Sequence, residues 1–541
     1  MRRILLLLVV VVMATSITCS AQNKRKNDAL CYRISDLVYD GREDEAEVVV
    51  DSMLNIYPLH ADMLHFKACH LYGRGDMDAA LDLYARALDN LGRKNCMSKS
   101  LMLYYRSCLY MDNGDYSLAI KDCTDAIASL KRNDKDLLAD ILMLRAECYY
   151  YDQRYEMAES DLLQVIYMAD GNSRVDYALS CICSVYREMG EYDNLFDYAQ
   201  LSLSRSDRFA ASVYKTMIFS CMDMGDTHRA IDYAIDMVLN ANVEIEDEFI
   251  SGIFFEDIEY ARSAIYKRIS ADADGEYMVE YINLCDCSME FGLSYELLKC
   301  IAEDLYEEES LYWLAHYSNM AGKYQCAVEH LNNLLEICSD ENRDYCTIML
   351  ADNYYSMGDY EMAIKESKKF ISLTPDDGYG YYFIGCCYEF SGDDANAVEC
   401  YNKAIELDQT DPYPYLMRGE QYLKVGDMER ARADFEHILE IDSGIGDDSV
   451  RHYALYFLGD EDGAKQLMQN IVDRCPYDNG VMYTAACFYA IIGDLNQSLD
   501  YLRLALCYGF RSKAHIENDD DLDPIRNMDA FEVLMNEYFN L

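Results

Sequence analysis

Small and bulky apolar residues recur around a short glycine phrase along most of the chain. A small residue such as Ala351 or Gly385 stands seven positions before many of these glycines, and an alanine such as Ala363 or Ala397 stands five positions after most of them. Intervals of three, four and seven residues place side chains on one face of an α-helix, whereas a strand repeats every two residues. The pattern therefore predicts pairs of helices that are joined by a tight turn at the glycine.

The turn phrase is Gly-Asp or a close variant of it. From residue 322 onward the glycines are 36, 34, 34, 33 and 34 residues apart. Glycine suits this turn because it adopts the left-handed conformation that ends a helix. One further copy keeps the surrounding pattern but has Gln153 at the turn. The glycines that begin the phrase are Gly41, Gly75, Gly114, Gly190, Gly225, Gly322, Gly358, Gly392, Gly426, Gly459 and Gly493.

These positions resemble the tetratricopeptide repeat, a helix–turn–helix module of about 34 residues. The resemblance covers residues 27 to about 510, is strongest over 308–440 and is lost near 243–307. It implies an all-α fold, a right-handed superhelical solenoid of about twelve repeats in which each repeat packs on its neighbours. The expected organisation is a signal peptide (1–21), an N-terminal array (22–242), an irregular helical segment or degenerate repeat (243–307), a C-terminal array (308–510) and a capping tail (511–541).

The N-terminus has the pattern of an export signal. Arg2 and Arg3 precede an apolar run from Ile4 to Ala14, which is too short to span a bilayer but suits the apolar region of a signal peptide. Small residues before Gln22 predict cleavage after Ala21. We therefore expect an exported protein, located in the periplasm or cell envelope of a Gram-negative bacterium.

Lipoprotein processing is the alternative for this signal, with a lipid anchor at Cys19. Bacterial lipoprotein signals usually carry Leu three residues before that cysteine and a small residue directly before it, whereas this chain has Ser16 and Thr18. We therefore favour cleavage after Ala21. No later stretch has 18 consecutive apolar residues, so no transmembrane segment is expected in the mature chain.

The net charge of the chain restricts the classes of molecule that it can bind. It has 541 residues, with 47 Lys and Arg against 97 Asp and Glu, which gives a formal net charge of −50. A polyanion of this size repels phosphate backbones, so we expect no binding of nucleic acid. Anionic membrane surfaces are disfavoured for the same reason.

Candidate chemistry is sparse, and we expect neither an enzyme nor a cofactor. The sequence has no phosphate-binding Gly-Lys-Ser/Thr loop, no His-Glu-x-x-His and no Gly-x-Ser-x-Gly. Its 22 cysteines form no Cys-x-x-Cys pair, and many fall where repeat helices crowd, so we interpret them as small apolar residues. Asp519, Asp521 and Asp523 alternate as in a calcium loop but lack its glycine and glutamate, which favours a capping turn.

The resemblance places ligands of such arrays in a concave groove lined by the first helix of each repeat. The residues expected there are aromatic and acidic, although some tyrosines should instead pack between repeats. They favour an extended or helical partner segment that is basic and apolar. The candidate groove residues are Trp313, His316, Asn319, Tyr345, Met349, Asp352, Tyr355, Tyr379, Tyr382, Phe383, Glu389, Phe390, Tyr413, Met417, Glu420 and Lys424.

Two classes of function remain from the sequence. The first is a non-catalytic scaffold for protein–protein interaction, because nothing else in the chain offers chemistry. The alternative is a cell-envelope glycan-binding or outer-membrane assembly lipoprotein. Sugar platforms usually use several exposed aromatic residues, and the chain has one tryptophan, so the alternative requires tyrosines in that role.

Overall fold

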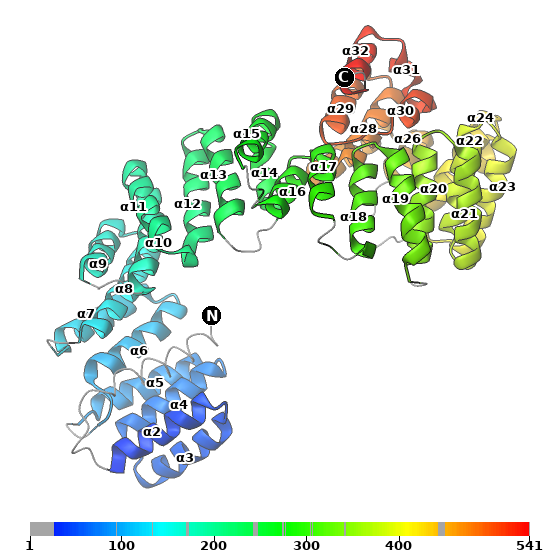
Figure 1. The fold of residues 1–541 in the computed structure, drawn as a ribbon. Coiled ribbons are helices and arrows are strands. Elements are labelled where there is room, and N and C mark those ends of the chain that lie inside the picture. Colours follow the sequence, from blue (N-terminus) through cyan, green and yellow to red (C-terminus); the bar gives the residue numbers. More distant parts are fainter. Residues whose placement is uncertain are drawn as a thin grey trace. The chain divides into compact units, whose positions relative to one another are not determined.

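The computed structural model describes residues 26–541 apart from 93–94, 132–133, 169–172, 242–246, 273–274, 276, 303–304, 306, 340–341, 442–449 and 540–541. The described elements are all helical, and they are arranged as successive antiparallel pairs (Figure 1). The prediction of an all-α repeat array is therefore confirmed. No helix among the described residues is long and apolar enough to cross a membrane. The expected signal peptide, Cys19 and Gln22 lie outside the described residues.

The chain divides into two compact units, Met1–Val243 and Glu244–Leu541. The described residues of the first unit form six helix pairs and one short 3-10 helix. Its elements are α2 (Lys26–Tyr39), α3 (Glu43–Ile56), α4 (Ala61–Gly73), α5 (Met77–Asp89), α6 (Lys99–Asp112), α7 (Tyr116–Ser129), α8 (Lys135–Tyr151), α9 (Tyr155–Met168), α10 (Ser173–Met189), α11 (Tyr192–Arg205), η1 (Asp207–Phe209), α12 (Ala210–Asp223) and α13 (Thr227–Asn240).

The second unit holds the strongest repeats and the C-terminal tail. Its elements are α14 (Asp247–Phe254), α15 (Ile258–Ala271), α16 (Met278–Cys287), α17 (Phe291–Ile301), α18 (Glu307–Met320), α19 (Tyr324–Ile337), α20 (Arg343–Ser356), α21 (Tyr360–Leu373), α22 (Tyr379–Phe390), α23 (Asp394–Leu407), α24 (Tyr413–Lys424), α25 (Met428–Glu440), α26 (Arg451–Leu458), α27 (Glu461–Arg474), α28 (Asn479–Ile491), α29 (Leu495–Cys507), α30 (Lys513–Asn518), η3 (Asp520–Leu522), α31 (Asp523–Arg526) and α32 (Asp529–Phe539).

The turn glycines have the conformation that the sequence predicts. All eleven have positive φ, between 71° and 96°, and Gln153 takes the same turn with φ 58°. In each turn the N–H that follows the glycine donates to a carbonyl five residues earlier, as from Asp393 to Tyr388 at 2.8 Å. The small residue before the turn lets the partner helix approach closely. A Cβ on Gly385, for example, would lie 2.4 Å from Cε1 of the buried Tyr401.

The irregular segment contains a repeat whose turn glycine is missing. Met289 has φ 58° between α16 and α17, and Glu290 N–H donates to Cys285 O at 2.7 Å, as in the other turns. The buried Ser294, five residues after Met289, takes the place of the usual alanine. Met289 stands 33 residues before Gly322, which is the spacing of the repeat. This copy cannot be recognised from the glycine phrase, because a methionine occupies the turn position with positive φ.

In three of the repeats that the structure describes, a buried ion pair joins the two helices. Arg106 with Asp122, Arg145 with Asp161 and Arg418 with Asp434 each stand 16 residues apart. In each pair the guanidinium donates to both carboxylate oxygens at 2.6–2.9 Å. The aspartates are 3–5% exposed, so the arginine balances a carboxylate that has little contact with water.

The second unit closes on itself, because its first helices contact its last repeat. The ring of Phe255 stacks on Tyr477, and Arg262 in α15 donates to the carbonyl of Cys507 at 2.9 Å. Beside them, Phe291 of α17 packs against Gly509, which follows α29. In Figure 1 the orange and red α28 and α29 accordingly lie beside the green α17. We call α14–α29 the closed array.

Candidate binding surface

The first helices α18, α20, α22 and α24 carry the groove residues expected from the sequence. Each of these first helices follows the second helix of the preceding repeat, and each ends shortly before a turn glycine. This gives the surface two edges. We call the edge at the glycine turns the turn edge, and the edge at the N-terminal ends of these helices the start edge.

The turn edge is covered by the C-terminal tail of the chain. His515 in α30 stacks on Phe390 with ring centroids 5.0 Å apart, and its Nδ1 lies 3.3 Å from the hydroxyl of Tyr355. Phe510 stacks on Tyr483 of α28, with ring centroids 4.2 Å apart, and so anchors the tail in the last repeat. The tail therefore connects the last repeat to α20 and α22. Burial lowers the pKa of His515, so its imidazole is neutral at pH 7.

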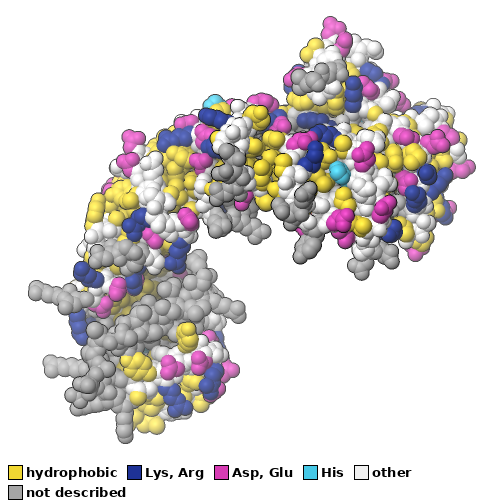
Figure 2. Space-filling view, viewed as in Figure 1, with side chains coloured by type: hydrophobic (Ala, Val, Ile, Leu, Met, Phe, Trp, Pro, Cys, Tyr) yellow, Lys and Arg dark blue, Asp and Glu magenta, His cyan; other side chains and the backbone are white. Residues whose placement is uncertain are grey.

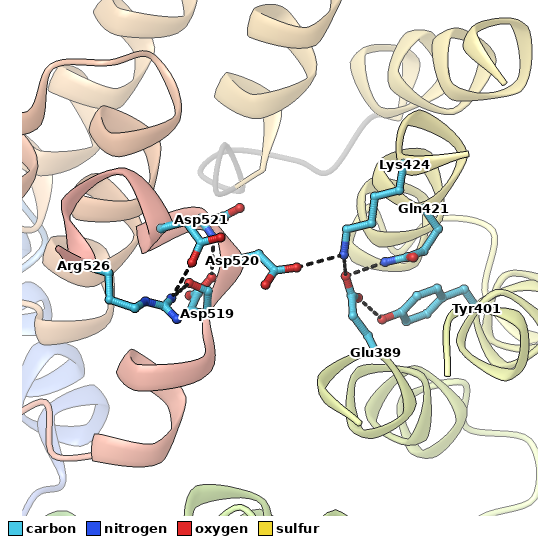
Figure 3. A network of polar contacts seen from close by, with 9 residues as sticks. Glu389, Tyr401, Gln421, Lys424, Asp519, Asp520, Asp521 and Arg526 are labelled. Carbon is cyan, nitrogen blue, oxygen red and sulfur yellow. Dashed lines mark hydrogen bonds and ion pairs between the residues drawn. The ribbon is translucent and has the colours of Figure 1, made fainter. Parts of the chain in front are cut away.

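A polar network holds the tail to α22 and α24 (Figure 3). Lys424 Nζ lies 3.0 Å from Glu389 Oε1 and 3.4 Å from Asp520 Oδ2. Glu389 also accepts the hydroxyl of Tyr401 at 2.8 Å and the amide of Gln421. Glu389 and Lys424 thus bind the chain's own tail and each other.

The same region holds an excess of carboxylates. Burial, with the neighbouring Asp521 and Glu389, raises the pKa of Glu420 well above its usual range. Burial, with Asp519 and Glu389, raises the pKa of Asp521 to about 8. At neutral pH Asp521 therefore favours the protonated form, because a negative charge that is buried beside other carboxylates is costly.

The start edge is open and aromatic. Trp313, Tyr345, Tyr379 and Tyr413 come from four successive first helices and are 37–49% exposed. The last three occupy the same position of their repeats, at spacings of 34 residues. Tyr382 lies between two of them, with its ring centroid 6.1 Å from those of Tyr379 and Tyr413. We call Trp313, Tyr345, Tyr379, Tyr382 and Tyr413 the aromatic row.

Carboxylates accompany the aromatic row. Asp344, Asp377 and Asp411 accept the backbone N–H groups of Tyr345, Tyr379 and Tyr413, at 2.7–3.0 Å. Three glutamates, 307–309, begin α18. Figure 2 shows acidic side chains at the lower end of α18, where this helix starts. The start edge therefore combines exposed rings with a row of negative charges.

An open pocket of about 560 Å³ lies at the start edge between α18, α19 and α20. Its floor is formed by the buried side chains of Leu334, Cys338 and Cys346. The two tyrosines Tyr312 and Tyr345 form a wall, with ring centroids 6.2 Å apart. The remaining lining residues are Glu308, Glu309 and Asn342.

The structure separates the predicted groove residues into four groups. Phe383 is not on the surface: it is 6% exposed and packs with Ala351, Ala363 and Cys387 because its helix turns it toward α21. Asn319 donates to Asn353 and, at 3.5 Å, to Asp352, which links α18 to α20. The residues at or near the tail are Tyr355, Glu389, Phe390, Glu420 and Lys424. Those in the first half of their helices are Trp313, Tyr345, Met349, Tyr379, Tyr382, Tyr413 and Met417, whereas His316 lies in the second half of α18.

Among the described residues, two groups of side chains approach metal-ligand spacing. They are Cys31 with Asp62 and Cys96, and Cys487 with Asp519 and Asp521. Asp62 accepts N–H groups from Cys96 and Met97, both at 3.0 Å, and so holds the loop before α6. Asp519 accepts the hydroxyl of Tyr483 at 2.6 Å. Both carboxylates thus already have structural partners.

Comparisons with known proteins find tetratricopeptide repeats in this chain. One family model described as tetratricopeptide repeat matches residues 348–377 and 379–411, and a second matches 400–433. A TPR repeat-containing protein of Methanocaldococcus jannaschii is 32% identical over 120 residues, which are 22% of this chain and 20% of that protein. The peptidyl-prolyl cis-trans isomerase FKBP4 of Homo sapiens is 28% identical over 123 residues, which are 20% of this chain and 27% of the isomerase.

Two solved structures are similar to this chain at low sequence identity. A tetratricopeptide repeat protein from Parabacteroides merdae is 19% identical, with a TM-score of 0.34, and the match covers 49% of this chain and 98% of that one. The APC/C hetero-tetramer Cut9-Hcn1 is 15% identical, with a TM-score of 0.30, over 84% of this chain and 95% of that one.

Proposed function

Because the chain is a tetratricopeptide-repeat protein, we propose that it is a non-catalytic scaffold for protein–protein interaction. It binds a segment of another protein along the start edge of its second unit. The observation that carries the proposal is the aromatic row. Large exposed rings recur once per repeat on four successive first helices, and such rings are common hot spots of protein interfaces. The turn edge is already covered by the tail, so the start edge is the part that faces a partner.

The partner segment that fits this surface is basic and apolar. Asp344, Asp377 and Asp411 lie beside the tyrosines of the aromatic row, and the whole chain has a formal charge of −50. Such a field attracts cations, speeds their association and repels polyanions such as nucleic acid. Exposed tyrosines beside the acids offer apolar contact and cation–π contact to the same segment.

A capture experiment with matched variants tests the proposal. The tagged mature chain is used to isolate partners from its native host, in parallel with Tyr379→Ala/Tyr413→Ala and with Tyr266→Ala. Tyr266 is 63% exposed on α15, away from the row, and serves as the control. We expect the double variant to lose the partner, with a cost of about 2 kcal/mol or more, and the control to retain it. Retention of the partner by a folded double variant would overturn the assignment.

Glycan binding in the cell envelope is the second candidate, and the same aromatic row favours it. Exposed tyrosines in series can stack on sugar rings as well as on peptide groups. A glycan array with the mature chain and the Tyr379→Ala/Tyr413→Ala variant separates the two functions. If the mature chain binds one glycan saturably and the double variant does not, the ligand of the aromatic row is a sugar and not a protein.

We also propose that the protein is exported, from the signal pattern in residues 1–21. N-terminal mass spectrometry of the protein from its native host tests this. A mature chain beginning at Gln22 supports export without an anchor, whereas a lipidated Cys19 would attach the protein to a membrane. An unprocessed Met1 would overturn the proposal.

A further inference from the structure

We propose that the pocket between α18, α19 and α20 takes an arginine side chain of the partner segment, a specificity site that rests on the proposed function. This pocket discriminates one partner segment from another, whereas the aromatic row supplies general contact. Its floor, its wall and its carboxylates each match a part of the arginine side chain.

The floor and the wall suit the aliphatic part and the plane of a long side chain. Leu334, Cys338 and Cys346 give an apolar floor. Burial raises the pKa of Cys346 to about 12, so this thiol adds no charge at neutral pH. The rings of Tyr312 and Tyr345 stand beside the floor as a pair. A guanidinium is planar and weakly hydrated, and it stacks on such rings at a smaller desolvation cost than an ammonium.

The charge of the pocket completes the match. Glu308 and Glu309 supply two carboxylates, and none of the described lining residues is basic. Arg343, which begins α20, is not among them. Asn342 donates to Glu308 at 3.4 Å and holds that carboxylate at the boundary between α18 and α20. Two carboxylates beside an aromatic wall bind a cation strongly, because the planar fork of arginine pairs with carboxylate oxygens while it stacks.

The position of the pocket joins it to the aromatic row. Tyr345 belongs to both, and Glu309 occupies in its repeat the position that Tyr345, Tyr379 and Tyr413 occupy in theirs. An extended segment that lies along the row therefore reaches the pocket at the α18 end. The pocket volume of about 560 Å³ lies within the range of roughly 300–1,000 Å³ that ligand sites occupy, so it admits one long side chain with adjoining backbone.

The test uses defined peptides and charge-matched variants. A fluorescein-labelled peptide of alternating leucine and arginine is titrated with the mature full chain, and its polarisation is compared with that of the same peptide carrying citrulline, which has arginine's shape without its charge. The variants are Glu308→Gln/Glu309→Gln and Tyr345→Ala. The control is Asp394→Asn/Glu429→Gln, which removes two exposed first-turn acids from α23 and α25 and so makes the same change in net charge.

We expect both pocket variants to bind the arginine peptide about tenfold more weakly and the control to change its affinity by less than about twofold. The citrulline peptide should bind weakly to every form of the chain. Equal weakening by the control variant, or equal affinity for the citrulline peptide, would overturn the pocket assignment. A captured partner that Glu308→Gln/Glu309→Gln retains, but Tyr379→Ala/Tyr413→Ala loses, would refute the pocket and leave the scaffold function intact.

Discussion

The ring of Phe255 stacks on that of Tyr477 at a centroid distance of 4.0 Å, which joins the start of the second unit to its last repeat. Tyr508 packs edge-on against the same phenylalanine at 5.1 Å. Repeat arrays usually contact only their sequence neighbours, and their stability is then a sum of local terms. Here α14 and α15 share contacts with the segments around α28 and α29, so the stability of the two ends is coupled.

Phe255→Ala should loosen both ends of the closed array together. Loss of the half-buried ring removes two aromatic contacts at once, and we expect a cost of about 2 kcal/mol or more. Hydrogen exchange should speed up in α15 and also in α29, although the substitution lies far from α29 in sequence. Tyr266→Ala, on the exposed side of α15, is the control and should leave both helices protected. Faster exchange in α15 alone would contradict closure.

Arg418→Met should destabilise its repeat by about 3–5 kcal/mol, because Asp434 then keeps a buried charge without its partner. The double variant Arg418→Met/Asp434→Leu should recover most of this loss, since no buried charge remains. Hydrogen exchange of α24 and α25 measures the local free energy of opening. Arg430→Met, which breaks an exposed pair with Asp427, is the control and should have no measurable effect. A double variant as unstable as the single one would refute this account.

Gln153→Gly should stabilise the fourth repeat by about 0.5–1 kcal/mol. Gln153 is exposed and holds φ at 58°, a conformation that costs a residue with a Cβ but not glycine. The reverse change, Gly392→Ala, should lower stability, because φ is 78° there and the Cβ gains no contact. Protection of the α8–α9 amides reports the first change, and protection of α22–α23 reports the second. The two substitutions should change the free energy of unfolding in opposite directions. A change in the same direction for both would show that backbone strain at positive φ is not the cause.

The second unit should lose stability as the pH rises from 6 to 9. The pKa of Asp521 is raised to about 8 in the folded chain, so its contribution is fully present below the unfolded pKa near 4 and is lost as pH passes about 8. Ordinary carboxylates are already ionised above pH 6 and add nothing in this window. Asp521→Asn should therefore flatten the dependence of melting temperature on pH. An unchanged slope would show that Asp521 does not titrate there.

The periodic part of the fold is predictable because it is local. A small residue, a turn glycine and an alanine at fixed spacings mark most of the helix pairs, and the eleven glycines all have the predicted conformation. The turn at Gln153 can be recognised from the surrounding residues, whereas the turn at Met289 cannot, because no glycine phrase marks it. The ion pairs at a spacing of 16 are not predictable from the repeat pattern either, although the spacing is visible in the sequence once the pairs are known.

The candidate site was only partly predictable, since its limits depend on contacts between distant residues. Repeat position alone cannot show that His515 would pack on Phe390, or that Lys424 would pair with Asp520. These contacts form because the array closes and so brings the C-terminal tail to α22 and α24. The tail covers the turn edge and leaves Tyr345, Tyr379 and Tyr413 at the opposite one.

Closure of the α14–α29 array also limits how this part of the protein can change in length. An open array gains a duplicated repeat at its end or in its middle at little cost, because each new copy supplies its own neighbours. An extra repeat inserted between α18 and α27 would displace Tyr477 from Phe255 and Cys507 from Arg262. The number of copies in 244–541 is therefore fixed by geometry, and duplications that survive there should leave that meeting point intact.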